Sequence, residues 1–267
     1  MSGAPEREQR FVFDEVAELY AEHRPSYPAQ LIDDLIAGAR LGPGSRVLEL
    51  GCGPGKASVL LAGRGYRLTC LEPGPRLAAL ARARLQTDPD ANVLTTTFEQ
   101  WPLQAAGFDL VFAAQSFHWI DPAVRFVKSA QALRAGATLA IFANRPERGE
   151  TALDLEIDAA YTVLGETWGR RTGTVVNSVE GFTRAFEESG VFEPPRCHEY
   201  RWSQDYAAEQ YVRLLQTQSD HALLTPDKRE PVLAAIERAI TEHGGVLHLS
   251  YATVLCYARA KIAGAGA

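Results

Sequence analysis

Short runs of apolar and β-branched residues alternate with amphipathic stretches through the first 142 residues of the chain. Five runs have the composition and length of buried strands, at residues 46–50, 66–71, 92–97, 108–114 and 136–142. Between them, apolar side chains recur at helical spacing, as at Leu77, Leu80, Ala81 and Leu85. This alternation predicts an α/β fold built on a doubly wound, mostly parallel sheet.

The pattern changes in the second half of the chain, where helices predominate. Thr151 with Asp154 is typical of a helix start, as are Ser178 and the Thr225-Pro226 pair. We expect helices near 151–165, 178–190, 205–218 and 226–242, and strands near 196–202 and 247–259.

The first predicted strand leads into a turn with three alternating glycines, Gly51, Gly53 and Gly55. In such a strand–turn–helix unit, backbone N–H groups face a ligand and no side chain blocks its approach. A dinucleotide-binding turn requires a further glycine where this chain has Lys56. A phosphate loop requires an earlier glycine and a metal-binding hydroxyl, which this turn lacks. The spacing disfavours both of these ligand classes.

What remains is the pattern acidic-x-Gly-x-Gly-x-Gly, which begins at Glu49. With these residues the chain resembles the class I S-adenosylmethionine-dependent methyltransferases, whose first motif has this form. The resemblance implies a seven-stranded, Rossmann-like methyltransferase fold with a helical lid. It also implies S-adenosylmethionine as cofactor and S-adenosylhomocysteine as its product, with Glu49 and the three glycines beside it. Cys52, inside the turn, is then a small residue next to the cofactor.

The resemblance also divides the chain into a cap, a core and a lid. We expect an N-terminal cap segment at residues 1–30 and a cofactor-binding α/β core at 31–146. We expect two helical lid insertions at 147–190 and 204–245, and the last two core strands at 191–203 and 246–267. In this family the last strand inserts antiparallel, and the lid selects the substrate. Trp168, Arg170 and Arg171 are the lid residues that we expect to contact it.

Glu72 stands directly after the second predicted strand, 17 residues beyond Gly55. Ligands of open parallel sheets bind at the carboxyl ends of strands. An acidic residue at this place can accept hydrogen bonds from ribose hydroxyls. We therefore expect Glu72 and its neighbour Pro73 to contact the adenosine of the cofactor, although a ribose alone does not separate S-adenosylmethionine from NAD.

Further cofactor contacts are implied by the resemblance. Phe98 and Glu99 resemble the family's acidic-aromatic segment, in which a ring faces the adenine and a carboxylate accepts from its amino group. Ala114 and Gln115 end the fourth predicted strand and are expected at the same edge of the sheet.

The segment before the first predicted strand resembles a subgroup that includes trans-aconitate methyltransferase. In this subgroup the segment folds over the cofactor. On that analogy Tyr20, Arg24 and Tyr27 close the pocket, with Arg24 near the cofactor's carboxylate. A surface helix with one solvent-exposed arginine is the alternative.

Residues 115–120 form a predicted loop at the ligand edge and contain a His-Trp pair that the same subgroup carries. A sulfonium methyl group is already an activated electrophile, so the enzyme mainly aligns the acceptor and excludes water. His118 is the candidate general base if the acceptor must lose a proton. A structural role beside Trp119 is the alternative for His118.

Composition narrows the choice of partners. The hydrophobic content of 46% with 22% charged residues is that of a globular protein. The net charge of -6 offers no basic footprint for nucleic acid or an anionic membrane.

The N-terminal residues lack the apolar core of a signal peptide, so we expect a cytoplasmic protein. The four cysteines are scattered without a C-x-x-C pair, and we expect neither a disulfide nor a metal site.

The sequence therefore predicts a methyltransferase that acts on a small molecule, with a carboxylate or hydroxyl oxygen as the favoured acceptor. One alternative is a protein that binds S-adenosylmethionine without turnover. Another is a nicotinamide-dependent oxidoreductase, which the glycine spacing disfavours.

Overall fold

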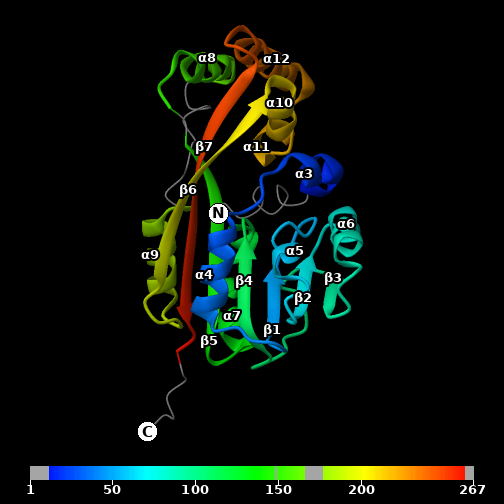
Figure 1. Ribbon diagram of the computed structural model, residues 1–267, viewed down its shortest axis with the longest axis vertical. Coiled ribbons are helices and arrows are strands. Elements are labelled where there is room, and N and C mark those ends of the chain that lie inside the picture. The colour runs from blue at the N-terminus through cyan, green and yellow to red at the C-terminus, as the bar shows by residue number, and fades with distance from the viewer. Residues whose placement is uncertain (1–11, 148, 166–176, 262–267) are drawn as a thin grey trace. The chain divides into compact units, whose positions relative to one another are not determined.

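The computed structural model describes residues 12–147, 149–165 and 177–261 of the 267-residue chain. Its strands form one seven-stranded sheet in the order β3-β2-β1-β4-β5-β7-β6 (Figure 1). The strands are β1 Arg46–Leu50, β2 Arg67–Glu72, β3 Ala91–Thr95, β4 Phe108–Ala114, β5 Leu133–Glu147, β6 Arg196–Ala207 and β7 Val246–Arg259. The α-helices are α2 Val12–Glu15, α3 Ala17–His23, α4 Ala29–Ala39, α5 Ser58–Leu61, α6 Pro75–Leu85, α7 Pro122–Ala132, α8 Ala152–Ala160, α9 Val179–Ser189, α10 Ala208–Gln216, α11 Ser219–Ala222 and α12 Pro226–Glu242. Two short 3-10 helices are η1 Phe117–Trp119 and η2 Tyr161–Leu164.

The first five strands are parallel, as predicted. β1 pairs with β2 on one side and with β4 on the other, while β2 also pairs with β3 and β4 with β5. The chain thus builds outward from β1 to β3 and then returns to the opposite side of β1. In open α/β sheets, ligands bind at the carboxyl ends of the strands where the order reverses. Here that place lies between β1 and β4. The strand order confirms the predicted doubly wound fold.

The last two strands lie beyond β5, with β7 between β5 and β6. Figure 1 shows β6 and β7 running in opposite directions. β6 continues to Ala207, so residues 204–207, predicted as the start of a lid insertion, belong to a strand. Most β6 residues are exposed or only partly buried, as befits the edge of the sheet. This exposure hides the alternating apolar pattern by which a strand is recognised.

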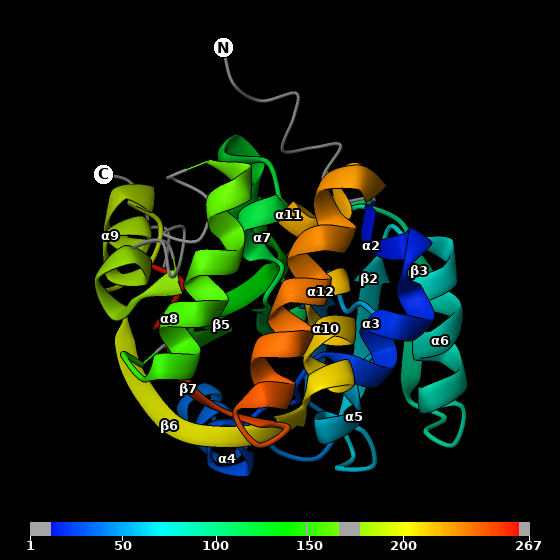
Figure 2. The same ribbon diagram turned by 90° about the horizontal axis from the view of Figure 1, so that it is seen from above.

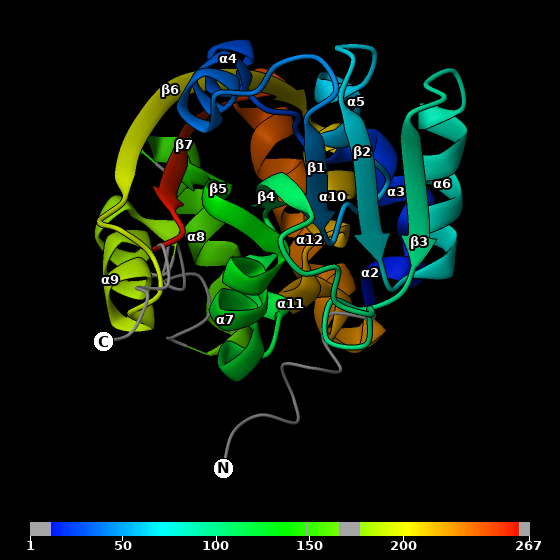
Figure 3. The same ribbon diagram turned by 90° about the horizontal axis from the view of Figure 1, so that it is seen from below.

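The chain divides into two compact units. The first, here called the core unit, comprises Ser26–Asn144, Val175–Tyr200 and Thr253–Ala267. Both faces of its sheet are covered, because strand residues alternate between two hydrophobic clusters. Helices α4, α5 and α6 contribute to one cluster and α7 and α9 to the other (Figure 3).

Helix α9 differs from its predicted place. The sequence assigns it to a lid insertion, whereas the structure groups it with the core unit. Its residues Phe182 and Phe186 lie in the same hydrophobic cluster as Phe126 of α7. Ser178 caps the helix by accepting a hydrogen bond from Gly181 N–H, and Gly190 ends it with a positive φ.

The second unit, here called the helical unit, comprises Met1–Pro25, Arg145–Thr174 and Arg201–Ala252. Within it α12 packs against α8 and α10, and α10 packs against α3 (Figure 2). Its cluster of buried apolar side chains includes Ile157, Leu215 and Ile236. The N-terminal helices α2 and α3 belong to this unit. The predicted substrate contacts Trp168, Arg170 and Arg171 lie outside the described residues. No helix within the described ranges combines the length and the apolar character needed to cross a membrane.

Cys197 and Cys256 form a disulfide within the core unit, contrary to the expectation that the cysteines stay unpaired. The two residues are 59 positions apart in the sequence, but they lie on the neighbouring strands β6 and β7 with their Cα atoms 4.1 Å apart. The pairing follows from strand order, which cysteine spacing does not reveal. Cys52 and Cys70 are buried free thiols.

Candidate functional site

The glycine turn between β1 and α5 depends on all three of its glycines. Gly51, Gly53 and Gly55 have φ values of 66°, 56° and 82°, a region that side-chain-bearing residues rarely adopt. A Cβ atom at Gly51 would also lie 2.8 Å from the Cβ of Ser116. The alternating glycines thus let the turn bend sharply while the loop after β4 approaches it closely.

Glu72 links this turn to the end of β2. Its Oε2 accepts a hydrogen bond from Gly53 N–H at 2.8 Å, and its Oε1 accepts one from Gly74 N–H at 2.9 Å. Each carboxylate oxygen can accept more than one hydrogen bond. The side chain is buried yet stands at the carboxyl end of a parallel strand, so it can hold the turn in place and still accept from ligand hydroxyls.

Glu49 lies on β1 under the turn. Its Oε2 accepts a hydrogen bond from Ser58 Oγ at 2.5 Å, which ties β1 to the start of α5. Burial raises the pKa of the Glu49 carboxyl well above its usual range, with a further contribution from Cys70. A neutral carboxyl is therefore favoured in this position, and its Oε1 has no hydrogen-bond partner among the described residues.

Cys52 is buried in the turn, where its neighbour Cys70 and the loss of solvent raise the pKa of its thiol well above the usual range. A thiol with a raised pKa is a poor nucleophile at neutral pH. The structure therefore favours a packing role for Cys52.

The loop after β4 is held against the glycine turn. The hydroxyl of Ser116 donates a hydrogen bond to the carbonyl oxygen of Leu50. Gln115 has a φ of 61°, a strained conformation for a residue with a side chain. The Ala114 backbone pairs with Phe142 of β5, and Gln115 N–H donates to the Phe142 carbonyl at 2.9 Å. Strain at the carboxyl edge of a parallel sheet is typical of functional sites.

Phe98 and Glu99, the predicted adenine contacts, lie in the segment after β3, and the Phe98 side chain is buried within the protein. The Phe98 side chain is only 4% exposed, and its ring stacks on Trp101 with centroids 6.2 Å apart. Lys128 donates hydrogen bonds to the carbonyls of Phe98, Glu99 and Trp101. Glu99 Oε1 accepts from Asp121 N–H at 3.1 Å. The adenine contacts of Phe98 and Glu99 stay predictions.

His118 lies on η1 after the Gln115 loop, with its ring 4.6 Å from that of Trp119. The residue is exposed at the surface, yet the protein atoms around its ring lower the pKa of His118 to about 4 by desolvation, with a second contribution from the positive charge of Arg125. The imidazole is therefore neutral at pH 7. It is able to accept a proton, but a pKa so far below neutrality makes it a weak base.

A pocket of about 200 Å³ adjoins this loop within the core unit. Residues from the loop after β4 and from η1, β5, α7 and α9 line it, among them Gln115, His118, Arg125, Phe142 and Phe182. The sequence placed His118 and Gln115 at the candidate site, but not Arg125 or the pocket-lining residues of α9, a helix that was itself predicted. Arg125 was missed because a single arginine on an amphipathic helix is indistinguishable from a surface residue.

The predicted cap residues are divided between the two units. Tyr27 belongs to the core unit and packs edge-on against Phe142, with ring centroids 4.9 Å apart. Tyr20 and Arg24 belong to the helical unit, where the guanidinium of Arg24 lies 5.1 Å from the Tyr20 ring centroid. Whether these three residues meet at a cofactor stays a prediction.

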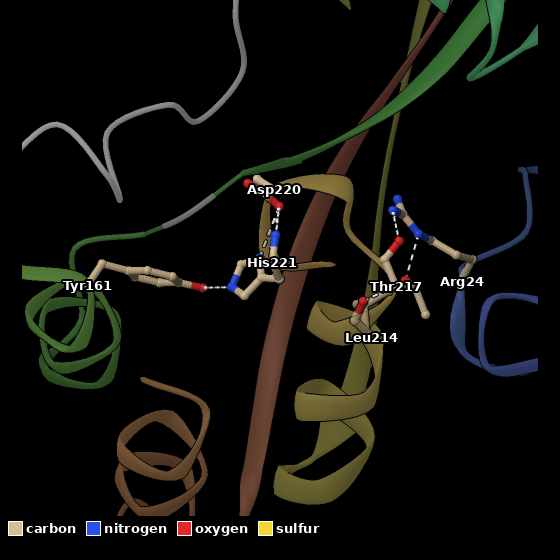
Figure 4. A network of polar contacts seen from close by, with 6 residues as sticks. All are labelled: Arg24, Tyr161, Leu214, Thr217, Asp220 and His221. Carbon is tan, nitrogen blue, oxygen red and sulfur yellow. Dashed lines mark hydrogen bonds and ion pairs between the residues drawn. The ribbon is translucent and has the colours of Figure 1, made fainter. Parts of the chain in front are cut away.

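Arg24 takes part in a polar network that sequence reasoning did not detect (Figure 4). Its Nε and Nη2 donate to the side-chain oxygen and the carbonyl of Thr217, both at 2.8 Å. In the same unit, the buried His221 pairs with Tyr161 Oη at 2.9 Å through Nε2 and with Asp220 Oδ1 at 3.0 Å through Nδ1. These contacts fix the α10–α11 junction to α3 and to η2, which indicates a structural role.

Comparison with known proteins agrees with this geometry. The family described as "Methyltransferase domain" matches residues 48–141. An uncharacterized methyltransferase of Mycobacterium tuberculosis H37Rv is 36% identical over 143 residues, which cover 53% of this chain and 56% of that protein. Trans-aconitate 2-methyltransferase of Afipia carboxidovorans is 31% identical over 111 residues, covering 40% of this chain and 42% of that protein. The chain thus spans about half the length of the curated relatives it matches.

Solved structures share the fold at low sequence identity. The [4+2]-cyclase SpnF has a TM-score of 0.58 at 15% identity, covering 96% of each chain. Phosphoethanolamine N-methyltransferase 2 of Haemonchus contortus, solved with S-adenosylhomocysteine, has a TM-score of 0.54 at 13% identity, covering 95% of this chain and 58% of that one. These two similarities establish the fold alone. The family match is the finding that bears on activity: its range, residues 48–141, contains the glycine motif and Glu72 and supports a class I S-adenosylmethionine-dependent methyltransferase domain there.

Proposed function

We propose that this chain transfers the methyl group of S-adenosylmethionine to an oxygen atom of a small molecule. The observation that carries the proposal is the linked pair of the glycine turn and Glu72, whose carboxylate binds Gly53 N–H at the carboxyl edge of the sheet. Three positive-φ glycines leave the approach to this edge free of side chains. A carboxylate at this place can accept hydrogen bonds from the two hydroxyls of an adenosine ribose.

Each part of the edge has a distinct task in this proposal. The turn residues and Cys52 would contact the amino-acid end of the cofactor, with Glu49 supporting them from beneath. Glu72 and Pro73 would hold the ribose, and Phe98 with Glu99 the adenine. Ala114 and Gln115 would border the transferred group. Tyr27 would border the cofactor within the core unit, and the cofactor contacts of Tyr20 and Arg24 stay predictions. The bound cofactor supplies an activated methyl electrophile, while these residues orient it and exclude water.

An oxygen acceptor is favoured for two reasons. Two of the relatives are named trans-aconitate 2-methyltransferase. His118, which lies beside the Gln115 loop, is neutral at pH 7 and only weakly basic. A carboxylate acceptor has no proton to lose and needs no stronger base, whereas a hydroxyl acceptor would need His118 to remove its proton.

Calorimetric titration with S-adenosylmethionine, S-adenosylhomocysteine and NADH tests the cofactor. We expect micromolar binding of the first two and no binding of NADH. Incubation with S-adenosylmethionine and a panel of carboxylic acids and phenols, trans-aconitate included, then tests turnover by mass spectrometry of the methylated product. Binding without any product would favour the non-catalytic alternative, and NADH binding alone would overturn the proposal.

His118→Ala separates the two kinds of oxygen acceptor. With a phenol, the loss of the base should lower kcat by about 100-fold and leave the affinity for S-adenosylhomocysteine unchanged. With a carboxylate, kcat should change by less than about threefold, because no proton is transferred. An equal loss with both acceptors would assign His118 a positioning role instead.

The pH dependence of the wild-type reaction gives a second test of His118. Because its pKa is lowered to about 4, the imidazole becomes protonated only below that pH. For a phenol, kcat should therefore show no inflection near pH 6.5, where an ordinary histidine titrates, and should fall toward pH 4. An acid limb centred near pH 6.5 that disappears in His118→Ala would contradict this expectation.

A further inference from the structure

The pocket beside the Gln115 loop contains polar atoms that the described protein leaves unpaired. Nε of Arg125 and Oε1 of Gln115 are both buried, and neither has a hydrogen-bond partner among the described residues. Both residues line the same pocket. Buried polar atoms are nearly always paired, because an unpaired one loses its hydrogen bonds to water without replacement. An unpaired donor and an unpaired acceptor therefore belong to two residues that line one cavity.

The position of Arg125 is fixed by packing. Its guanidinium carbon lies 5.4 Å from the Phe117 ring centroid and 5.6 Å from that of Phe126. Burial lowers the pKa of Arg125, but an arginine keeps its charge at any pH at which the protein is folded. No carboxylate among the described residues lies within ion-pair distance of it. A partly buried positive charge without a counter-ion favours an anionic ligand.

The other charged groups of the pocket do not cancel this preference. Arg184 and Glu188 line it from α9, and both are exposed. His118 contributes no charge at neutral pH. The pocket therefore carries one net positive charge, and Arg125 is its partly buried cation. Phe117, Phe142 and Phe182 supply apolar walls. A ligand with a carboxylate and a compact apolar body matches these features.

We propose that this pocket binds the methyl acceptor and that the acceptor carries a carboxylate held by Arg125. The assignment as an acceptor site rests on the proposed methyltransferase function. Arginine donates two aligned hydrogen bonds to a carboxylate, and Nε is one of the two donors in the side-on arrangement. Arg125 is then the residue that selects acids over neutral molecules of the same shape.

Matched ligand pairs test this selection. Benzoate, succinate and trans-aconitate are compared with benzamide, succinamide and the trimethyl ester of trans-aconitate, by calorimetry on the full chain saturated with S-adenosylhomocysteine. At least one acid should bind at least tenfold more tightly than its neutral counterpart. If no acid binds, or if the neutral partners bind equally well, the pocket holds water rather than a carboxylate and the proposal fails.

Variants locate the binding within the pocket. Arg125→Gln should weaken the tightest acid by at least tenfold, and Arg125→Lys, which keeps the charge without Nε, should weaken it less. Glu188→Gln removes the opposing charge and should tighten binding several-fold. Glu187→Gln is the matched control, because its residue is exposed on the same helix but does not line the pocket. An unchanged affinity in Arg125→Gln, or equal effects of the two glutamate variants, would overturn the proposal. Should Arg125→Gln fail to fold, the comparison of Glu188→Gln with Glu187→Gln decides.

The same samples separate this inference from the proposed function. If wild-type protein binds benzoate in an Arg125-dependent way but does not bind S-adenosylhomocysteine, the methyltransferase proposal fails and the carboxylate site stands. If it binds S-adenosylhomocysteine and methylates phenols while no acid binds, the carboxylate site fails and the methyltransferase proposal stands.

Discussion

Gly51→Ala should destabilise the protein by about 3 kcal/mol and abolish measurable binding of S-adenosylhomocysteine. Two physical costs add at this position. A left-handed conformation costs a residue with a side chain about 1–2 kcal/mol, and the φ of Gly51 is 66°. The new Cβ would also lie 2.8 Å from the Cβ of Ser116, so the loop after β4 must move, which typically costs about 1–3 kcal/mol. The measurements are urea unfolding and calorimetric titration.

Gly63→Ala is the matched control for Gly51→Ala. Gly63 has a nearly equal φ of 72°, but a Cβ atom there would meet no atom within 4 Å. It should therefore lose only the conformational part, about 1 kcal/mol, and keep its affinity for S-adenosylhomocysteine. If the two variants were equally stable and bound equally well, the contact between the turn and Ser116 would have no role in shaping the site.

The parallel half of the fold was predictable because its signals are local. Each of the first five strands shows as a short apolar run, and beyond them the predicted helix starts at Thr151 and Ser178 carry side chains that cap α8 and α9. Apolar periodicity and capping depend only on residues a few positions apart. Strict alternation of strands and helices then leaves few possible topologies.

The errors concern partners that are distant in sequence. The grouping of α9 with the core unit depends on Phe182 and Phe186 reaching the cluster around Phe126, which no local pattern indicates. The disulfide between Cys197 and Cys256 depends on β7 lying next to β6. The end of β6 was missed because an edge strand has few buried residues to reveal its period.

The candidate site shows the same division. The glycine turn and Glu72 were found because their spacing along the chain is itself the motif. The pocket residue Arg125 was not found, since its significance comes from an unpaired Nε and from the rings of Phe117 and Phe126 around it. The low pKa of His118 is likewise a product of its surroundings, with Arg125 as a contributing charge. The motif spacing therefore indicated the candidate cofactor site, whereas the neighbouring pocket depends on contacts that form only when the chain folds.

Glu72→Gln should weaken S-adenosylhomocysteine binding by about 10- to 100-fold, the effect of losing charge-assisted hydrogen bonds to two hydroxyls. The substitution keeps the size of the side chain but replaces one accepting oxygen by a donating amide nitrogen. Either Gly53 N–H or Gly74 N–H then loses its acceptor, which should lower the free energy of unfolding by about 1–3 kcal/mol. Unfolding and titration measure the two effects separately. Glu187→Gln, on an exposed face of α9, is the control for the chemical change itself.

A second ligand distinguishes a direct ribose contact from a general distortion of the turn. The 2′,3′-dideoxy analogue of S-adenosylhomocysteine lacks the hydroxyls that Glu72 is proposed to bind. Wild-type protein should bind this analogue about 10- to 100-fold more weakly than S-adenosylhomocysteine, and Glu72→Gln should bind the two ligands almost equally, because the interaction is already lost. If the variant weakened both ligands by the same factor, Glu72 would act only through Gly53 and Gly74. The carboxylate would then shape the turn without touching the ribose.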